Sequence, residues 1–132
     1  MIGIVVVSHG RLAEELVKAA ETIVGQSPLI VAVSIGWTDD PSVTNEAIKK
    51  ALADVGSDGV LVLTDMFGGT PTNVSLPFLG DGIDIVTGVS LPMVIKALAL
   101  REGELAAVAR AVRDQGRGAI VVASELLGKT EP

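Results

Sequence analysis

Five short apolar runs divide the chain, and none of them alternates apolar with polar residues. They are rich in Val, Ile and Leu and cover residues 2–7, 29–33, 60–63, 83–86 and 119–123. An uninterrupted β-branched run is typical of a strand that is covered on both faces, as in a parallel sheet. The pattern therefore predicts five buried strands.

The segments between these runs have helical periodicity. Proline marks three helix starts and glycine marks helix ends. The starts are Asp40-Pro41, with Asp40 as N-cap, Thr70-Pro71, with Thr70 as N-cap, and Leu91-Pro92; Gly25, Gly56, Gly103 and Gly116 end or separate helices. Pro77 lies about two turns into the third predicted helix, so it should shorten or kink that helix.

Strands and helices alternate along the whole chain, which predicts an α/β fold with a mostly parallel open sheet and right-handed crossovers. Helices on both faces of the sheet would give three layers. The length of 132 residues fits one domain, residues 1–132.

Composition narrows the classes of protein and of chemistry. Aromatic residues make up only 2% of the chain against 48% for all hydrophobic residues, so the core must be aliphatic. The chain has no cysteine, which excludes disulfides and thiolate chemistry. The net charge of −6 and the scattered basic residues argue against nucleic acid as a partner. No apolar run approaches the roughly 20 residues of a membrane span, and no basic signal region precedes the first run. We therefore expect a cytoplasmic protein.

Polar residues gather where the predicted strands end, and ligands of open parallel sheets bind at those carboxyl ends. The residues after the first, second and third strands are Ser8-His9-Gly10-Arg11, Gly36-Trp37-Thr38 and Asp65-Met66-Phe67-Gly68-Gly69-Thr70-Pro71, and the fourth strand is followed by Thr87-Gly88-Val89-Ser90. We expect the functional site on this rim.

His9, the only histidine, has two interpretations: a ring that bonds to local main chain, or a reactive imidazole. Asp65 favours the second, because its carboxylate can accept a hydrogen bond from Nδ1–H and leave the lone pair of Nε2 exposed. A neighbouring carboxylate would also stabilise the positive character of a phosphorylated imidazole. Taken alone, Asp65 is equally well explained as an N-cap or an exposed side chain.

Gly68, Gly69 and Thr70 can surround an anion, because glycines let main-chain amides approach closely and a helix starts there. The alternative is an ordinary turn into a helix. The chain has neither G-x-x-x-x-G-K-[ST] nor G-x-G-x-x-G, so direct use of ATP or of a dinucleotide is not expected. No cofactor and no metal is predicted, and Asp39 and Asp40 are explained more simply by a helix start.

Two further residues of the rim have open roles. Arg11 can contact phosphate or a partner, although an exposed arginine in a first helical turn is more common. Trp37 can line a docking face or cover the core, and the sequence favours neither.

Three segments resemble the mannose-type (mannose, fructose, sorbose) IIA domains of the bacterial phosphoenolpyruvate-dependent sugar phosphotransferase system. They are IGIVVVSHGRLAEELVKAAETIVG, DGVLVLTDMFGGTPTNVSL and VTGVSLPMVIKAL, and together they extend over about the whole domain. The resemblance implies that His9 is phosphorylated, that Asp65 orients it, and that Gly68, Gly69 and Thr70 surround the phosphoryl group.

The resemblance also implies partners. These are a phosphohistidine carrier of the HPr type as donor, a IIB domain as acceptor, peripheral association with a membrane sugar permease, and a second copy that exchanges its last strand, residues 119–123. No IIB domain follows in this chain, so the expected acceptor is a separate protein. The sequence departs from the family pattern at Pro77 and at Trp37, where a smaller or acidic residue is usual.

Two other functions use the same residues. One is a regulatory protein of the phosphotransferase system, in which phosphorylation of His9 controls partner binding. The other is a receiver-like domain phosphorylated on Asp65. The first strand ends in Ser8-His9-Gly10 instead of the acidic metal-binding pair that such phosphoryl transfer needs, which argues against the receiver.

Overall fold

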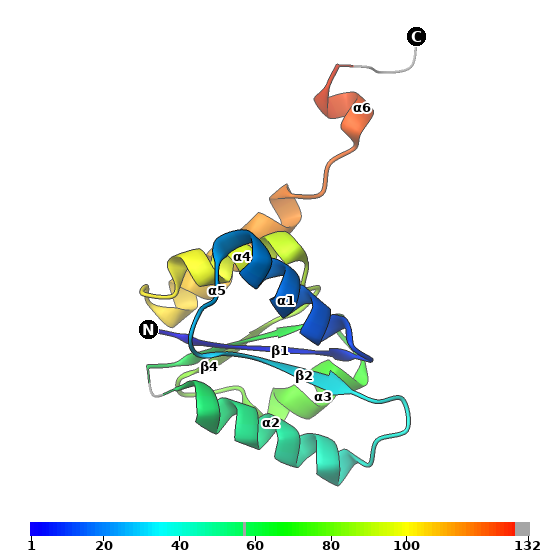
Figure 1. Cartoon of the computed structure of the whole chain (residues 1–132), viewed down its shortest axis with the longest axis vertical. Coiled ribbons are helices and arrows are strands. Elements are labelled where there is room, and N and C mark those ends of the chain that lie inside the picture. The colour runs from blue at the N-terminus through cyan, green and yellow to red at the C-terminus, as the bar shows by residue number, and fades with distance from the viewer. Residues whose placement is uncertain (57, 129–132) are drawn as a thin grey trace.

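Four of the five predicted strands form one parallel sheet in the computed structural model, which describes residues 1–56 and 58–128 (Figure 1). The strands are β1 (Gly3–His9), β2 (Ile30–Ile35), β3 (Val60–Thr64) and β4 (Ile83–Val86). They lie in the order β2-β1-β3-β4, and every neighbouring pair is parallel. The predicted α/β fold with a parallel open sheet is confirmed.

Helices cover both faces of this sheet and complete three layers (Figure 1). One face carries α1 (Leu12–Val24), α4 (Leu91–Leu100) and α5 (Leu105–Gly118); the other carries α2 (Pro41–Val55) and the short α3 (Thr70–Ser75), which continues into the 3₁₀ turn η1 (Leu76–Phe78). A last short helix, α6 (Ala123–Leu126), lies beyond the end of α5 and away from the sheet.

The central strand β1 shows why the apolar runs do not alternate. Ile4 and Val6 pack with residues of α1, α4 and α5, whereas Val5 and Val7 pack with residues of α2. All four side chains are fully buried. Both sides of the strand meet a helical layer, so both must be apolar.

Three strands, β1, β2 and β3, extend further than predicted at their carboxyl ends. The prediction ended the first strand at Val7 because Ser8 is polar, yet Ser8 is fully buried and His9 is the last residue of β1. The Ser8 hydroxyl accepts a hydrogen bond from the amide of Ala13 (2.6 Å) and donates to the carbonyl of His9 (3.1 Å). These local bonds satisfy the hydroxyl and allow a polar residue inside a buried strand.

Two predicted helix ends are wrong, whereas others, including Gly25 after α1 and Gly56 after α2, are confirmed. Asp40 caps α2 through its bond with the amide of Ser42, with Pro41 following, and Pro77 ends α3 early as expected. Gly69, not Thr70, is the N-cap of α3. Helix α5 does not end at Gly116 but continues to Gly118. Gly116 instead allows close packing, because a Cβ there would lie 2.6 Å from Sδ of Met93.

The fifth predicted strand, residues 119–123, is not a strand in the single chain. Residues 120–122 have no regular structure and lead into α6 (Figure 1). Their side chains are exposed, by 83% for Ile120, 55% for Val121 and 59% for Val122. A strand requires a partner edge, and this segment leaves the body of the fold without pairing with any described strand.

Arg101 closes the amino-terminal edge of the sheet. Its side chain is only 4% exposed and donates to the main-chain oxygens of Ile2, Pro28 and Leu29, the shortest of these bonds being 2.6 Å to Pro28. Burial lowers the pKa of Arg101. Main-chain oxygens thus solvate this buried charge and join the end of α4 to the start of β1 and β2.

Within the described residues, no helix has both the length and the apolar character needed to cross a bilayer.

Candidate functional site

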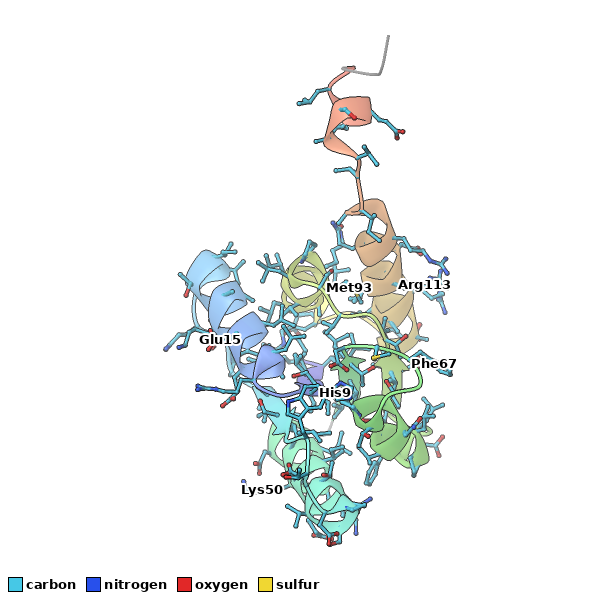
Figure 2. The ribbon with its side chains drawn as sticks, turned by 90° about the vertical axis from the view of Figure 1, so that its right-hand side faces the viewer. His9, Glu15, Lys50, Phe67, Met93 and Arg113 are labelled. Atoms are coloured by element: carbon cyan, nitrogen blue, oxygen red, sulfur yellow. The ribbon has the colours of Figure 1, made fainter. Side chains whose placement is uncertain are left out.

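The residues predicted for the site meet at the carboxyl edge of the sheet. Figure 2 views the molecule from this edge and shows His9 near its middle, with Phe67 on the same side. Strand β1 ends in His9, and β3 is followed directly by Asp65. Because β1 and β3 are parallel neighbours, the two side chains come from adjacent strand ends.

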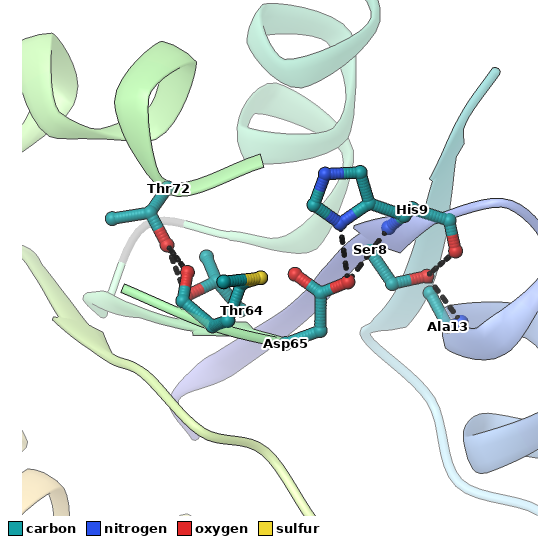
Figure 3. Close-up of polar contacts among 7 residues, drawn as sticks. Ser8, His9, Ala13, Thr64, Asp65 and Thr72 are labelled. Atoms are coloured by element: carbon teal, nitrogen blue, oxygen red, sulfur yellow. Dashed lines mark hydrogen bonds and ion pairs between the residues drawn. The ribbon is translucent and has the colours of Figure 1, made fainter. Parts of the chain in front are cut away.

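One oxygen of Asp65 holds His9 at two points (Figure 3). Oδ2 accepts a bond from the main-chain amide of His9 (2.9 Å) and lies 2.8 Å from Nδ1 of its imidazole. The His9 side chain is 23% exposed and that of Asp65 is 12% exposed. The contact is therefore largely shielded from water, while part of the imidazole stays accessible.

The surroundings of Asp65 favour its ionised form. Partial burial alone would raise the pKa of Asp65, but the hydrogen bonds from the amide and the imidazole of His9 outweigh it and bring this pKa below its usual value. Because a carboxylate only accepts, Nδ1 of the neutral imidazole is the donor, and the free lone pair lies on Nε2.

The turn after β3 places Gly69 against the same imidazole. A Cβ at Gly69 would lie 2.8 Å from Cε1 and 3.4 Å from Nε2 of His9, so only glycine leaves the ring in this position. Gly68 adopts a φ of +85°, which favours glycine for a different reason. Gly69 thus has a structural role beside the imidazole, and Gly68 has one in the turn itself.

A buried hydroxyl fixes the path of this turn. The Thr72 hydroxyl lies within hydrogen-bond distance of the Thr64 hydroxyl (2.7 Å) and of the main-chain oxygen of Met66 (2.5 Å) (Figure 3). Thr64 and Thr72 are fully buried. This pair was not predicted from the sequence, although two threonines on either side of a glycine-rich turn were an available signal.

Thr70 begins α3 and does not cap it. Thr70 is exposed, makes no capping bond with its side chain and is the first helical residue. Helix α3 has only 6 residues, so its macrodipole is weaker than that of a longer helix. Favourable contacts with an anion would therefore rest on the amides of the turn.

The indole of Trp37 stacks on the imidazole of His9, with ring centroids 5.0 Å apart and an angle of 19° between the planes. Trp37 is 80% exposed, so it does not cover the core. The interpretation that Trp37 covers the core is therefore wrong. Sequence reasoning missed the stacking, because it depends on how the loop after β2 bends over the end of β1.

The remaining candidates do not join the site. Arg11 is exposed and forms an ion pair with Glu14 (3.4 Å). Asp39 and Asp40 bond to nearby main-chain amides, of Gly36 and Ser42. No group of three or more His, Cys, Asp or Glu able to hold a metal ion occurs among the residues that the structure describes.

This arrangement suits a nucleophilic imidazole. Nε2 carries the lone pair, the carboxylate supports the ring from the opposite nitrogen, and Gly69 leaves room beside the reacting edge. Oδ1 of Asp65 is buried and has no hydrogen-bond partner among the described residues.

Comparisons with known proteins agree on one family. Residues 3–113 match the family model described as "PTS system fructose IIA component". The chain is 31% identical over 105 residues to the fructose-specific EIIA component of Bacillus subtilis, covering 77% of this chain and 72% of that protein. It is 32% identical over 111 residues to the mannose-specific EIIAB component of Escherichia coli, covering 78% of this chain but only 33% of that longer protein.

Among solved structures, the mannose/sorbose-specific IIA subunit of Enterococcus faecalis superposes with a TM-score of 0.85. It shares 30% sequence identity, and the superposition covers 92% of this chain and 93% of that one.

Proposed function

The chain belongs to the family of PTS fructose IIA components, and from that premise we propose that it is a phosphocarrier whose reactive atom is Nε2 of His9. It receives a phosphoryl group from a phosphohistidine carrier of the HPr type and passes the group to a IIB domain. The observation that carries this proposal is the 2.8 Å contact between Nδ1 of His9 and Oδ2 of Asp65, which leaves Nε2 as the free nucleophile.

The proposed transfer of the phosphoryl group between two imidazoles requires neither a base nor a nucleotide. The lone pair of Nε2 forms the new N–P bond, and the electron pair of the donor's N–P bond returns to the donor's ring nitrogen. The proton on Nδ1 of His9 stays in place, so the ring becomes positively charged while the donor's ring loses its charge. Asp65 stabilises this cation, and the same contact supports the reverse step toward the acceptor.

Gly68, Gly69 and Thr70 are proposed to surround the phosphoryl oxygens during transfer. The support is positional: Gly69 is the residue whose Cβ would collide with the Cε1–Nε2 edge of the imidazole. A main chain that approaches so closely can direct amides toward an anion at Nε2.

We also propose a homodimer in which residues 119–123 pair with β4 of the other copy. Strand β4 is the last strand of the sheet, so one of its edges is free of described strands. A groove of 510 Å³ lies beside it, lined by residues of β4 and α5 and by Ile120. The exposed Val121 and Val122 are apolar and suit a buried strand.

The proposed phosphorylation is tested with purified phosphorylated carrier bearing labelled phosphate. We expect the wild-type chain to take up label that is acid-labile and resistant to hydroxylamine, as phosphohistidine is. His9→Ala should take up none, with an unchanged circular dichroism spectrum. Labelling of His9→Ala at the wild-type level would refute the mechanism, and an acyl phosphate on Asp65 would instead be cleaved by hydroxylamine.

Asp65→Asn is the companion variant. It should fold and react at Nε2 roughly 10- to 100-fold more slowly, because a hydrogen bond to a charged group contributes about 1.5–3 kcal/mol. Onward transfer to a IIB domain separates the phosphocarrier from the regulatory protein, which would be phosphorylated without passing the group on.

A further inference from the structure

Trp37 is an unusually exposed tryptophan held in one place. Its side chain is 80% exposed, so burial does not explain its position. It nevertheless lies face to face with His9, at 5.0 Å between ring centroids. Trp37 is also the only tryptophan of the chain.

Hydrogen bonds within the loop and at its start hold the segment that carries Trp37. The Gly36 amide donates to Oδ2 of Asp39 (2.7 Å), and the Asp39 amide donates to the carbonyl of Gly36 (3.3 Å). A Cβ at Gly36 would lie 2.6 Å from Oδ1 of Asp39, so the carboxylate packs directly against the main chain. The amide of Gly10 also donates to the carbonyl of Ile35 (2.8 Å), which ties the end of β2 to the residue after His9.

We propose that Trp37 is a positioning residue that stabilises the phosphorylated imidazole. This inference rests on the proposed function, in which the ring of His9 gains positive charge when Nε2 takes the phosphoryl group. A cation over the face of an indole is attracted by the negative face of the π system. Asp65 stabilises the same charge from the ring edge, at Nδ1, and Trp37 acts from the ring face.

Stabilisation of the product can be measured separately from docking of a partner. The equilibrium constant for transfer from the phosphorylated carrier depends only on the four free proteins before and after the reaction. Contacts that exist only in the complex change the rates in both directions and cancel from this constant. An exposed aromatic side chain that only contacts the carrier in the complex therefore changes the rates of transfer but not the equilibrium constant.

Phe67 provides a matched control for this distinction. It lies on the same rim and is 71% exposed, but no stacking with His9 is found for it. Trp37→Leu and Phe67→Leu each remove one exposed aromatic side chain. Of these two side chains, only that of Trp37 stacks on the imidazole.

The experiment mixes labelled phosphorylated carrier with each variant and measures the phosphorylated fractions at equilibrium. We expect Trp37→Leu to lower the equilibrium constant about two- to fivefold, the factor of an exposed cation–π contact. Trp37→Phe should recover most of the loss, and Phe67→Leu should keep the wild-type constant. Equal constants for wild type and Trp37→Leu would overturn the role of Trp37 while leaving the proposed function intact.

A second measurement needs no phosphate. Emission from the single tryptophan should differ between the wild type and His9→Leu, because the stacked imidazole is removed, and Phe67→Leu should have wild-type emission. Identical spectra for wild type and His9→Leu would show that the rings are not stacked and would also overturn the inference. Failure of the wild type to take up label would overturn the proposed function, and the role of Trp37 in phosphate transfer with it.

Discussion

Three residues restrict the imidazole of His9, each in a different way. Asp65 fixes Nδ1, Trp37 covers one face, and Gly69 leaves space along the edge that carries Nε2. The ring is therefore oriented before any partner arrives. Such preorganisation reduces the rearrangement that a reacting group needs in the transition state.

The hydrogen bonds that Asp65 accepts from His9 make the stability of the fold depend on pH. The pKa of Asp65 in the folded chain is below its usual value, so the unfolded chain binds a proton more readily. The stabilisation is complete above the ordinary pKa of aspartic acid, about 4, and is lost as the pH falls through the lower folded value. We expect the difference in free energy of unfolding between the wild type and Asp65→Asn to shrink below about pH 4.

Urea unfolding at a series of pH values measures this difference. Asp40→Asn is a useful comparison, because the pKa of Asp40 is also lowered, mainly by its bond with the Ser42 amide, but Asp40 is exposed and its carboxylate bonds to Ser42 instead of His9. A difference between wild type and Asp65→Asn that stays constant from neutral pH to about pH 3 would show that the carboxylate does not stabilise the fold.

At the scale of elements, the turn between β3 and α3 brings its main chain close to the imidazole of His9. The buried Thr72 hydroxyl bonds to Thr64 and Met66 and so fixes the turn to the end of β3. Gly69 lies against the imidazole. The turn thus connects the end of β3 to the Cε1–Nε2 edge of the imidazole through main chain alone.

Gly69→Ala tests this arrangement. The added methyl would lie 2.8 Å from Cε1 of His9 and 3.2 Å from Cγ of Met66, so the ring must move. We expect phosphoryl transfer to fall at least about tenfold, with a loss of stability of only about 1–2 kcal/mol because Gly69 has a φ of −89° that alanine accepts. Rapid-quench kinetics and urea unfolding measure the two quantities.

Gly118→Ala is the matched control, because a Cβ there meets nothing within 4 Å. It should transfer phosphate at the wild-type rate. Wild-type kinetics in Gly69→Ala would mean that the imidazole does not occupy the position seen in the structure.

The elements themselves were largely predictable, and the failures have identifiable causes. Uninterrupted apolar runs located all four observed strands, because both faces of a central strand require apolar residues. Ser8 was misread since a hydroxyl that bonds to its own turn can be buried, and Gly116 was misread because its role is contact with Met93.

The site was predictable in its residues but not in its contacts. Parallel strand ends brought His9 and Asp65 together as expected, since adjacent parallel strands end at the same edge. The stacking of Trp37 was not predictable, because the bend of a loop between elements depends on local bonds such as that of Asp39 with Gly36.

For the whole molecule, the projecting segment after α5 is unusual because its apolar side chains are exposed in a single chain. It exposes Ile120, Val121, Val122, Leu126 and Leu127, all apolar. Water contact with so many apolar side chains is unfavourable unless another surface covers them. The free edge of β4 in a second copy is the surface proposed above.

Val121→Asp tests this assembly. We expect the wild-type chain to sediment as a dimer and Val121→Asp to shift to monomer, because a carboxylate in a buried strand loses its hydration. Analytical ultracentrifugation of the full chain over a range of concentrations measures the change. Ile23→Asp, at an exposed apolar position on α1, should remain dimeric. A wild-type monomer at every concentration would contradict the dimer.

The bonds of Arg101 lie at the end of β1 opposite to His9, and the strand between them has 7 residues, or roughly 20 Å. The contacts that close the fold and the loops around the imidazole therefore occupy separate ends of the molecule. Loops around the imidazole can diverge in sequence, and with them the choice of partner, without altering the bonds that close the opposite edge. A scaffold of this kind allows many pairings to evolve from one architecture.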